Sequence, residues 1–152
     1  MITAFLQYLA TLLRQDLTAD SRLLPELAEL PVRVAFLDPE PEGDHVTLTA
    51  EGADRLIDGE HIYRVTATLA VVVYANSRTA ESARELLTAA GGCVLRTLSY
   101  GWHDRRLPQL AAHVYSLEPE LEPLQTVGSA YETRLAITAN VHFYPTAPPC
   151  VG

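Results

Sequence analysis

The sequence predicts a single α+β domain, built as a mixed or antiparallel sheet of four to five strands with helices packed on one face. A length of 152 residues suits one domain. Residues 2–17 and 79–98 repeat apolar side chains at helical spacing, whereas residues 63–75 and 130–144 alternate apolar and polar side chains as strands do. Because each of these segments has one apolar face, the helices and strands are expected to bury those faces against each other.

The first part of the chain predicts two helices followed by two strands. Residues 2–17 form the long helix, and a short helix is expected within residues 22–30, where a proline is tolerated in the first turn. Residues 32–37 are β-branched and bounded by prolines, so they predict a strand. Residues 45–50 alternate apolar and polar side chains and predict a second strand. The acidic residues 51–60 contain two glycines and are expected to form a loop.

The second helix, residues 79–98, follows polar residues that suit a helix N-cap and is interrupted by Gly91-Gly92. Each glycine costs about 1 kcal/mol relative to alanine inside a helix. We therefore expect either a break at this point or a neighbouring backbone packed closely against it. Residues 109–117 predict a strand that dissolves into an acidic, proline-spaced loop.

Two segments of about 14 residues each predict strands much longer than the usual 5–6 residues. A straight strand of that length spans roughly 45 Å at about 3.4 Å per residue. A domain of this size is only roughly 30–35 Å across. The strands, 63–75 and 130–144, are therefore expected to bend around the body or to overhang it.

The two long strands share a second property: the face opposite their apolar face carries threonines and small groups, with few long charges. Such a face suits contact with another protein better than contact with water, although a plain solvent-facing sheet is the alternative. We predict that these side chains lie in a contact with another protein; they are Arg64, Thr66, Thr68, Arg134 and Thr138.

The charge of the chain is acidic and unevenly distributed. The formal net charge is −8, all eleven basic residues are arginines, and the acidic residues concentrate between Asp38 and Glu60. This distribution argues against a nucleic-acid grip, which needs clustered basic side chains. The acidic stretch is interpreted either as two solvated loops or as a surface that repels phosphate or meets a basic partner. The longest apolar run is too short to span a membrane, and no signal peptide is expected, which favours synthesis in a cytoplasm.

No pattern in the sequence predicts catalysis, a cofactor or a metal site. The five histidines are scattered, and the chain lacks a phosphate-binding loop and a nucleophile elbow. Cys93 and Cys150 have no spacing typical of a zinc site, while a disulfide between them stays open. We expect no catalytic, cofactor-binding or metal-binding residues, and therefore no enzyme.

The order of helix, strands, long strand, helix, strand and long final strand resembles one family. With "YRVTATLAVVVYANSRTAESARELL" at 63–87 and "YETRLAITANVHFY" at 131–144, the chain resembles the tail terminator, or tail completion, proteins of tailed bacteriophages. The resemblance covers residues 1–144, taken as one tail-terminator-like domain, and leaves residues 145–152 as a proline-rich C-terminal tail. The acidic stretch 38–60 and this tail depart from the family pattern.

The resemblance implies a structural virion protein that caps the head-proximal end of the tail tube. Such a protein stops tube polymerisation and forms the docking surface for the head connector. Members of the family form homohexameric rings, so the first implied partner is another copy of the same chain. The other implied partners are the tail tube protein and the head–tail connector protein. DNA passes through the ring without specific binding, and no membrane is involved. The resemblance also implies that the five residues singled out on the two long strands lie in or beside a subunit interface or line the lumen of this ring; they are Arg64, Thr66, Thr68, Arg134 and Thr138. The implied location is the tail or neck of the virion, after assembly in the host cytoplasm.

The long strands acquire a purpose under this resemblance, since overhanging strands can extend a sheet into a neighbouring subunit through main-chain hydrogen bonds. Two alternatives stay open. One is a head-completion or neck protein of the same assembly, and the other is a small α+β ligand-binding or enzyme subunit. The contractile or non-contractile type of the tail and the stoichiometry of the ring are left undecided by the sequence.

Overall fold

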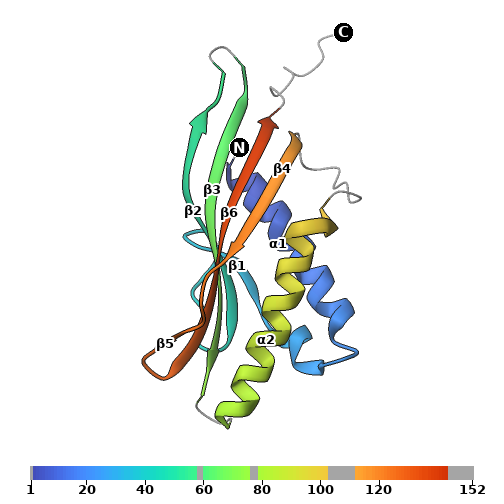
Figure 1. Ribbon diagram of the computed structural model, residues 1–152, viewed down its shortest axis with the longest axis vertical. Coiled ribbons are helices and arrows are strands. Elements are labelled where there is room, and N and C mark those ends of the chain that lie inside the picture. Colours follow the sequence, from blue (N-terminus) through green and yellow to red (C-terminus); the bar gives the residue numbers. More distant parts are fainter. Residues whose placement is uncertain (1, 58–59, 76–78, 103–111, 144–152) are drawn as a thin grey trace.

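A computed structural model describes residues 2–57, 60–75, 79–102 and 112–143 (Figure 1). Both α-helices and every strand found in these residues belong to one α+β domain, which confirms the predicted fold class. The elements follow the chain in this order: α1 (Ile2–Asp20), the 3₁₀ helix η1 (Pro25–Glu29), β1 (Val32–Val34), β2 (His45–Arg55), β3 (Ile62–Tyr74), α2 (Ala80–Arg96), the π-helical turn η2 (Thr97–Gly101), β4 (Ala112–Leu121), β5 (Gln125–Val127) and β6 (Ala130–Phe143). The predicted tail, 145–152, lies outside the described residues.

The sheet is mixed and has the strand order β1-β2-β3-β6-β4, with β5 also paired to β6. Only the β1–β2 pair is parallel, and the other described pairs are antiparallel. Six strands are present in the described residues, so the expected four to five were too few. The reason is the length of β6, which pairs with β5 near its start and with β4 along the rest of the same edge.

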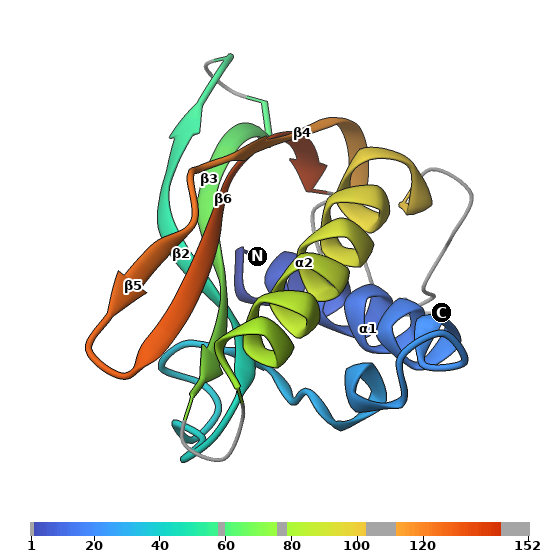
Figure 2. The same cartoon turned by 60° about the horizontal axis from the view of Figure 1, so that its bottom comes forward.

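The two α-helices cover one face of the sheet, as predicted, and the core lies between these two layers (Figures 1 and 2). Helical periodicity aims one stripe of each helix at the sheet, and strand alternation aims every second residue at the helices. Fully buried side chains from both layers form one cluster, including Phe5, Leu9, Leu13, Leu86, Val94, Val65, Leu69, Leu135 and Ile137.

The long strands both curve and overhang. Strand β3 has 13 residues and β6 has 14, close to the predicted length. Figure 2 shows the sheet curling around the helices, and Figure 1 shows the β2–β3 hairpin reaching past the ends of both helices. The hairpin of β5 and β6 projects from the lower part of the sheet in the same view. The part of each long strand that the core does not need therefore forms hairpins that project from the margin of the domain.

The predicted ends of the first two strands are wrong. The first strand ends at Val34 instead of residue 37, because the chain turns at once through Phe36, whose φ is 71°. Strand β2 continues to Arg55, beyond the predicted end at residue 50. A bulge between Ala50 and Gly52 keeps it paired to β3, so part of the expected acidic loop is strand.

The strand predicted at 109–117 is present over residues 112–117, but its predicted end is too early. Its first residues, 109–111, lie outside the described part of the chain, and β4 continues to Leu121. It therefore includes part of the expected proline-spaced loop. Pro119 is tolerated there because β4 lies at the margin of the sheet, where a missing N–H costs no ladder hydrogen bond.

Helix α2 runs without interruption through its two glycines and ends in the π-helical turn. Its N-cap is Thr79, whose hydroxyl accepts a hydrogen bond from the Ser82 N–H at 3.1 Å. The expected break is absent from the described helix, and the expected close backbone is replaced by a side chain. A Cβ built on Gly91 would lie 3.6 Å from Thr133 Cγ2, an ordinary contact, while Gly92 faces open space.

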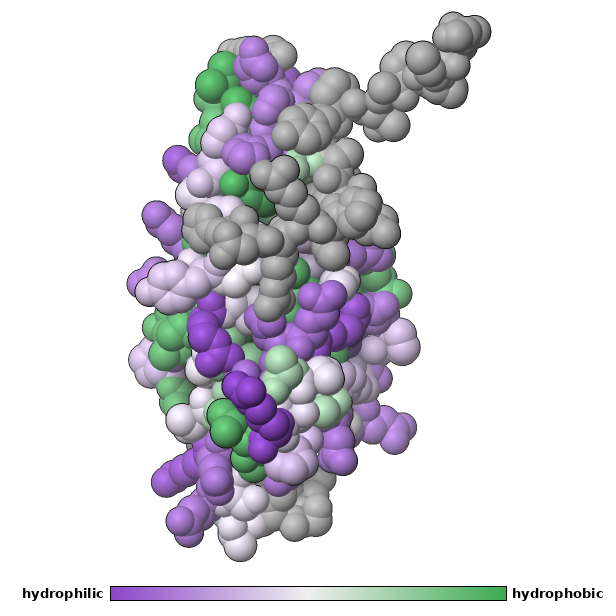
Figure 3. All heavy atoms as spheres, turned by 90° about the vertical axis from the view of Figure 1, so that its right-hand side faces the viewer, coloured by the Kyte–Doolittle hydropathy of each residue, from purple (hydrophilic) through white to green (hydrophobic). Residues whose placement is uncertain are grey.

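The helix side of the molecule is largely hydrophilic, with apolar residues scattered over it (Figure 3). No helix in the described ranges is both long enough and apolar enough to cross a membrane.

Candidate subunit interface

The five residues predicted for an interface share one face of the two central strands. In the antiparallel register of β3 and β6, Thr66 lies directly opposite Thr138, and Arg134 lies opposite Ala70. Arg64 and Thr68 alternate with the core residues of β3 and so point to the same side as Thr66. The structure thus brings all five residues onto one surface, which we call the open face.

The open face extends beyond the central strands onto β2 and β4. Cross-strand partners point to the same side of a sheet, so each row can be followed from strand to strand. One row contains Thr66 and Thr138 with Gly52 in β2 and Glu118 in β4. The neighbouring rows add further side chains to this face: Thr49, Thr68, Ala136 and Glu120, and then Asp54, Arg64, Asn140 and Ser116.

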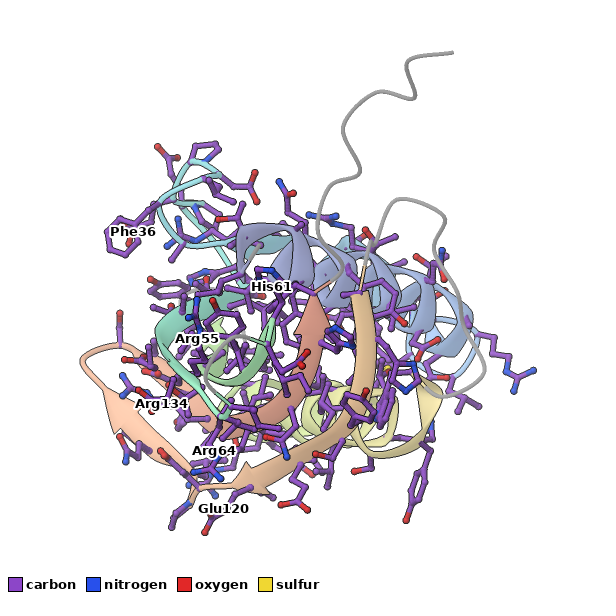
Figure 4. All side chains as sticks on the ribbon, turned by 90° about the horizontal axis from the view of Figure 1, so that it is seen from above. Phe36, Arg55, His61, Arg64, Glu120 and Arg134 are labelled. Atoms are coloured by element: carbon purple, nitrogen blue, oxygen red, sulfur yellow. The ribbon has the colours of Figure 1, made fainter. Side chains whose placement is uncertain are left out.

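Within the described residues, the open face carries no helix. Both α-helices lie on the opposite side of the sheet (Figure 2). Arg64, Arg134 and Glu120 point away from the helices (Figure 4). The three threonines Thr66, Thr68 and Thr138 are half-buried. The centre of the open face therefore has short, weakly polar side chains, and the long charged side chains lie around this centre.

Arg134 is held in place by a carboxylate on its own strand. Its Nε forms an ion pair with Glu132 Oε1, and the Glu132 side chain is nearly buried while that of Arg134 is 48% exposed. The hydrogen bond that Arg134 donates to Glu132, together with the negative charge of that carboxylate, raises the pKa of Arg134 above the ordinary value. Arg134 thus stays charged and fixed at the margin of the threonine-rich centre.

Hydrogen bonding is incomplete at the other end of the open face. Asn140 Oδ1 is buried and has no hydrogen-bond partner among the described residues. Its cross-strand neighbour Arg64 is exposed. By contrast, the Thr66 hydroxyl donates to the Gly52 carbonyl oxygen at 3.3 Å, across the bulge in β2. Buried polar atoms are normally satisfied, so Asn140 Oδ1 is an exception among the described residues of this face.

Sequence reasoning missed the residues that β2 and β4 add to the open face. Asp54, Glu118 and Glu120 were assigned to acidic loops, since acidic residues beside glycine or proline are typical of loops. The available signal was weak in both places. In β2 the bulge interrupts the alternation, and in β4 the strand is mostly exposed and so lacks an apolar repeat.

A second polar cluster joins the two helices on the far side of the sheet. The Thr97 hydroxyl donates to Asp16 Oδ2, and Arg96 pairs with Asp20. Burial alone would raise the pKa of Asp20, but its hydrogen bonds with Arg96 and Cys93 hold that pKa below the ordinary value. Burial, and then the hydrogen bond with Asp20, raises the pKa of the Cys93 thiol to about 12.

This cluster ties α1 to α2, and it includes the one cysteine that the structure describes. Cys93 is buried and free, while Cys150 lies outside the described residues. Across the parts of the chain that are described, no group of three His, Cys, Asp or Glu side chains is arranged to hold a metal ion.

Comparison with known proteins leaves the function to be argued from this geometry. No protein-family profile matches the chain, and no curated protein matches it. One solved structure, whose name states no function, is similar with a TM-score of 0.47 and 20% sequence identity, over 86% of this chain and 97% of that chain. A likeness at this level carries no conclusion about function.

Proposed function

We propose that this protein is a ring-forming structural subunit of the virion that caps the head-proximal end of a phage tail tube. The observation that carries the proposal is that the two faces of the sheet differ. Helices seal one face, and the other presents small and threonine side chains along strands of 13 and 14 residues. The resemblance of these same strands to tail terminator proteins supports the assignment.

The open face is better suited to joining subunits than the free edges of the sheet. Edge strands that avoid pairing carry prolines, bulges and charges. Strand β4 has Pro119 between two glutamates, and the part of β2 that extends beyond β1 has a bulge and the acidic residues Glu51 and Asp54. Main-chain extension of the sheet is therefore disfavoured at both edges, and the ring is held mainly by side-chain contacts on the open face.

The composition of the open face fits a subunit contact or a lumen wall. Threonine presents only a small polar group in a strand, so a different surface of the neighbouring subunit can approach the open face closely at little desolvation cost. The chain carries a net charge of −8, so its ring would not trap DNA by strong attraction. Under the proposal the ring's further partners are the tail tube protein and the head–tail connector protein, and its place is the tail or neck of the virion.

Two measurements test the proposal. Sizing by light scattering and negative-stain micrographs of the purified protein should show a closed ring of about six copies, the outcome of a head-to-tail contact whose rotation closes. Adding the protein to growing tail tubes of the same phage should stop their elongation. A protein that stays a compact monomer at all concentrations, and leaves tube growth unchanged, would contradict the proposal.

A further inference from the structure

Phe36 has an unusual backbone conformation. Its φ of 71° is the only positive value among non-glycine residues in the described ranges. A bulky L-residue in this left-handed region is a genuine outlier, because its Cβ crowds the following carbonyl oxygen. Such conformations persist only where the surrounding structure enforces them, and they cluster at functional positions.

The turn that carries Phe36 is held by hydrogen bonds on both sides. The Val34 carbonyl oxygen accepts from the N–H groups of Leu37 (3.2 Å) and Asp38 (3.1 Å). In return, Asp38 Oδ2 accepts from the Val34 N–H at 2.9 Å. Arg33 then fastens the turn to β2, donating to the Asp38 carbonyl at 3.2 Å and to Thr47 Oγ1 at 3.0 Å. The strained conformation is therefore built into the end of β1.

This turn places the aromatic ring in solvent. The Phe36 side chain is 96% exposed, and Figure 4 shows it projecting away from the body of the protein. The neighbouring Leu37 is also exposed. Because the ring makes little contact with its own chain, the strain is not repaid by packing within the fold. Rigidly presented aromatic side chains of this kind are typical anchors of protein interfaces.

The charges near Phe36 identify the kind of surface that it fits. Asp38, Glu40 and Glu42 follow on the same loop, and all three are exposed. A partner pocket should therefore carry basic side chains around an apolar centre, since complementary charge favours encounter and like charge opposes it.

Another copy of this chain is a poor match for Phe36. Its exposed leucines Leu121 and Leu124, at the opposite edge of the sheet, stand beside Glu120 and Glu122. Docking Phe36 there would bring acid against acid. The chain as a whole is also acidic, with a net charge of −8, and this favours a different, basic protein as the partner.

We propose that Phe36 is an anchor that inserts into an apolar pocket rimmed by arginine or lysine on a protein other than this one. The inference rests on the proposed function only for the choice of candidates, which are the tail tube protein and the head–tail connector protein. Its partner is thus distinct from the copies that meet at the open face.

The variants Phe36→Gly and Phe36→Ala of the purified protein test whether Phe36 is strained and contributes little to the stability of its own fold. Glycine accepts the left-handed conformation and alanine does not, so the glycine variant should melt about 3 °C above the alanine variant. Phe36→Ala should melt within about 1 °C of the wild type, because the ring is exposed. Both variants should keep the wild-type oligomeric size. A loss of several degrees in Phe36→Ala, or a change of size in either variant, would overturn the proposal.

Binding to the purified tail tube and connector proteins of the same phage tests whether Phe36 anchors a partner protein. Both Phe36 variants should bind one of the two about thirtyfold more weakly than the wild type, the effect of truncating an aromatic anchor. Leu23→Ala, which removes another exposed side chain at the α1–η1 turn, should bind normally. Glu40→Gln with Glu42→Gln should reduce the salt dependence of binding.

The outcomes separate this proposal from the function. If the wild type forms rings and binds a partner, but the Phe36 variants bind equally well, only the anchor is refuted. If the variant with Glu40→Gln and Glu42→Gln keeps the full salt dependence of binding, only the basic rim of the partner pocket is refuted. If the wild type forms no ring and binds neither protein, the proposed function and the anchor both fall.

Discussion

The thiol of Cys93 shows how burial at a single residue determines reactivity. Thiolate is the reactive form of cysteine, and burial beside Asp20 raises the pKa of this thiol to about 12. We predict that iodoacetamide at about pH 8 leaves Cys93 unmodified in the folded protein. Mass spectrometry of the Cys93 peptide measures this directly, and the same reagent in guanidinium should modify it fully. Rapid modification of the folded protein would show that the helix pair opens easily.

The ion pair between Arg96 and Asp20 stabilises the fold to an extent that depends on pH. It holds the pKa of Asp20 below the ordinary value, so the stabilisation is present above the unfolded pKa and disappears as pH falls through the folded one. Arg96→Gln should therefore lower stability at neutral pH by about 1 kcal/mol or less, since this pair is partly exposed. The difference should shrink as pH falls below about 4 and vanish only where Asp20 is protonated in the folded protein as well. Denaturant titrations at both pH values check it, and an equal loss at both would exclude the ion pair as its cause.

At the scale of the elements, the sequence predicts well what depends on periodicity and poorly what depends on pairing. The helices and the long strands repeat apolar side chains over many residues, so their positions and inner faces could be predicted. Strand β2 was cut short because its bulge shifts the alternation after Ala50. Strand β5 has only three residues and exists because β6 offers it an edge. No local pattern encodes such a partner.

The glycine pair of α2 gives an element-scale prediction. Gly92 faces open space in the middle of the helix, so Gly92→Ala should stabilise the protein by about 1 kcal/mol. That corresponds to a rise of about 3 °C in melting temperature. Gly91 instead faces Thr133 on β6, where a methyl group fits but a larger side chain does not. Gly91→Leu should therefore lower stability by about 1–3 kcal/mol through overpacking. Calorimetry of both variants checks the contrast, which would be contradicted if Gly91→Leu melted as high as Gly92→Ala.

At the scale of the whole molecule, the candidate interface could be predicted as one side of two strands but not as a surface. Alternation alone placed Thr66 and Thr138 on the side away from the core. Their direct opposition depends on β3 and β6 being neighbours, although α2 and β4 separate them along the chain. The rim of the surface depends on β2 and β4 flanking that pair. These relations are set by packing of the complete sheet around the helices.

This arrangement makes Thr66 and Thr138 the sharpest test of the ring. Thr66→Glu with Thr138→Glu places two carboxylates opposite each other at the centre of the open face, in the same row as Glu118. If a neighbouring subunit covers that face, the unpaired charges cost about 3–5 kcal/mol, which weakens association at least about a hundredfold. Sizing should then show monomers, and tails should fail to join heads.

Like charges across strands could also weaken the sheet itself, so two companion variants separate folding from assembly. Thr66→Glu with Thr138→Arg pairs the charges across the strands but still adds bulk to the open face, and it should fold and remain monomeric. Thr3→Glu with Thr88→Glu makes the same change at exposed positions on α1 and α2, and it should keep the wild-type size. Circular dichroism verifies that each variant is folded. If the charge-paired variant still assembles into wild-type rings that join heads to tails, the open face is exposed to solvent and the subunits meet elsewhere.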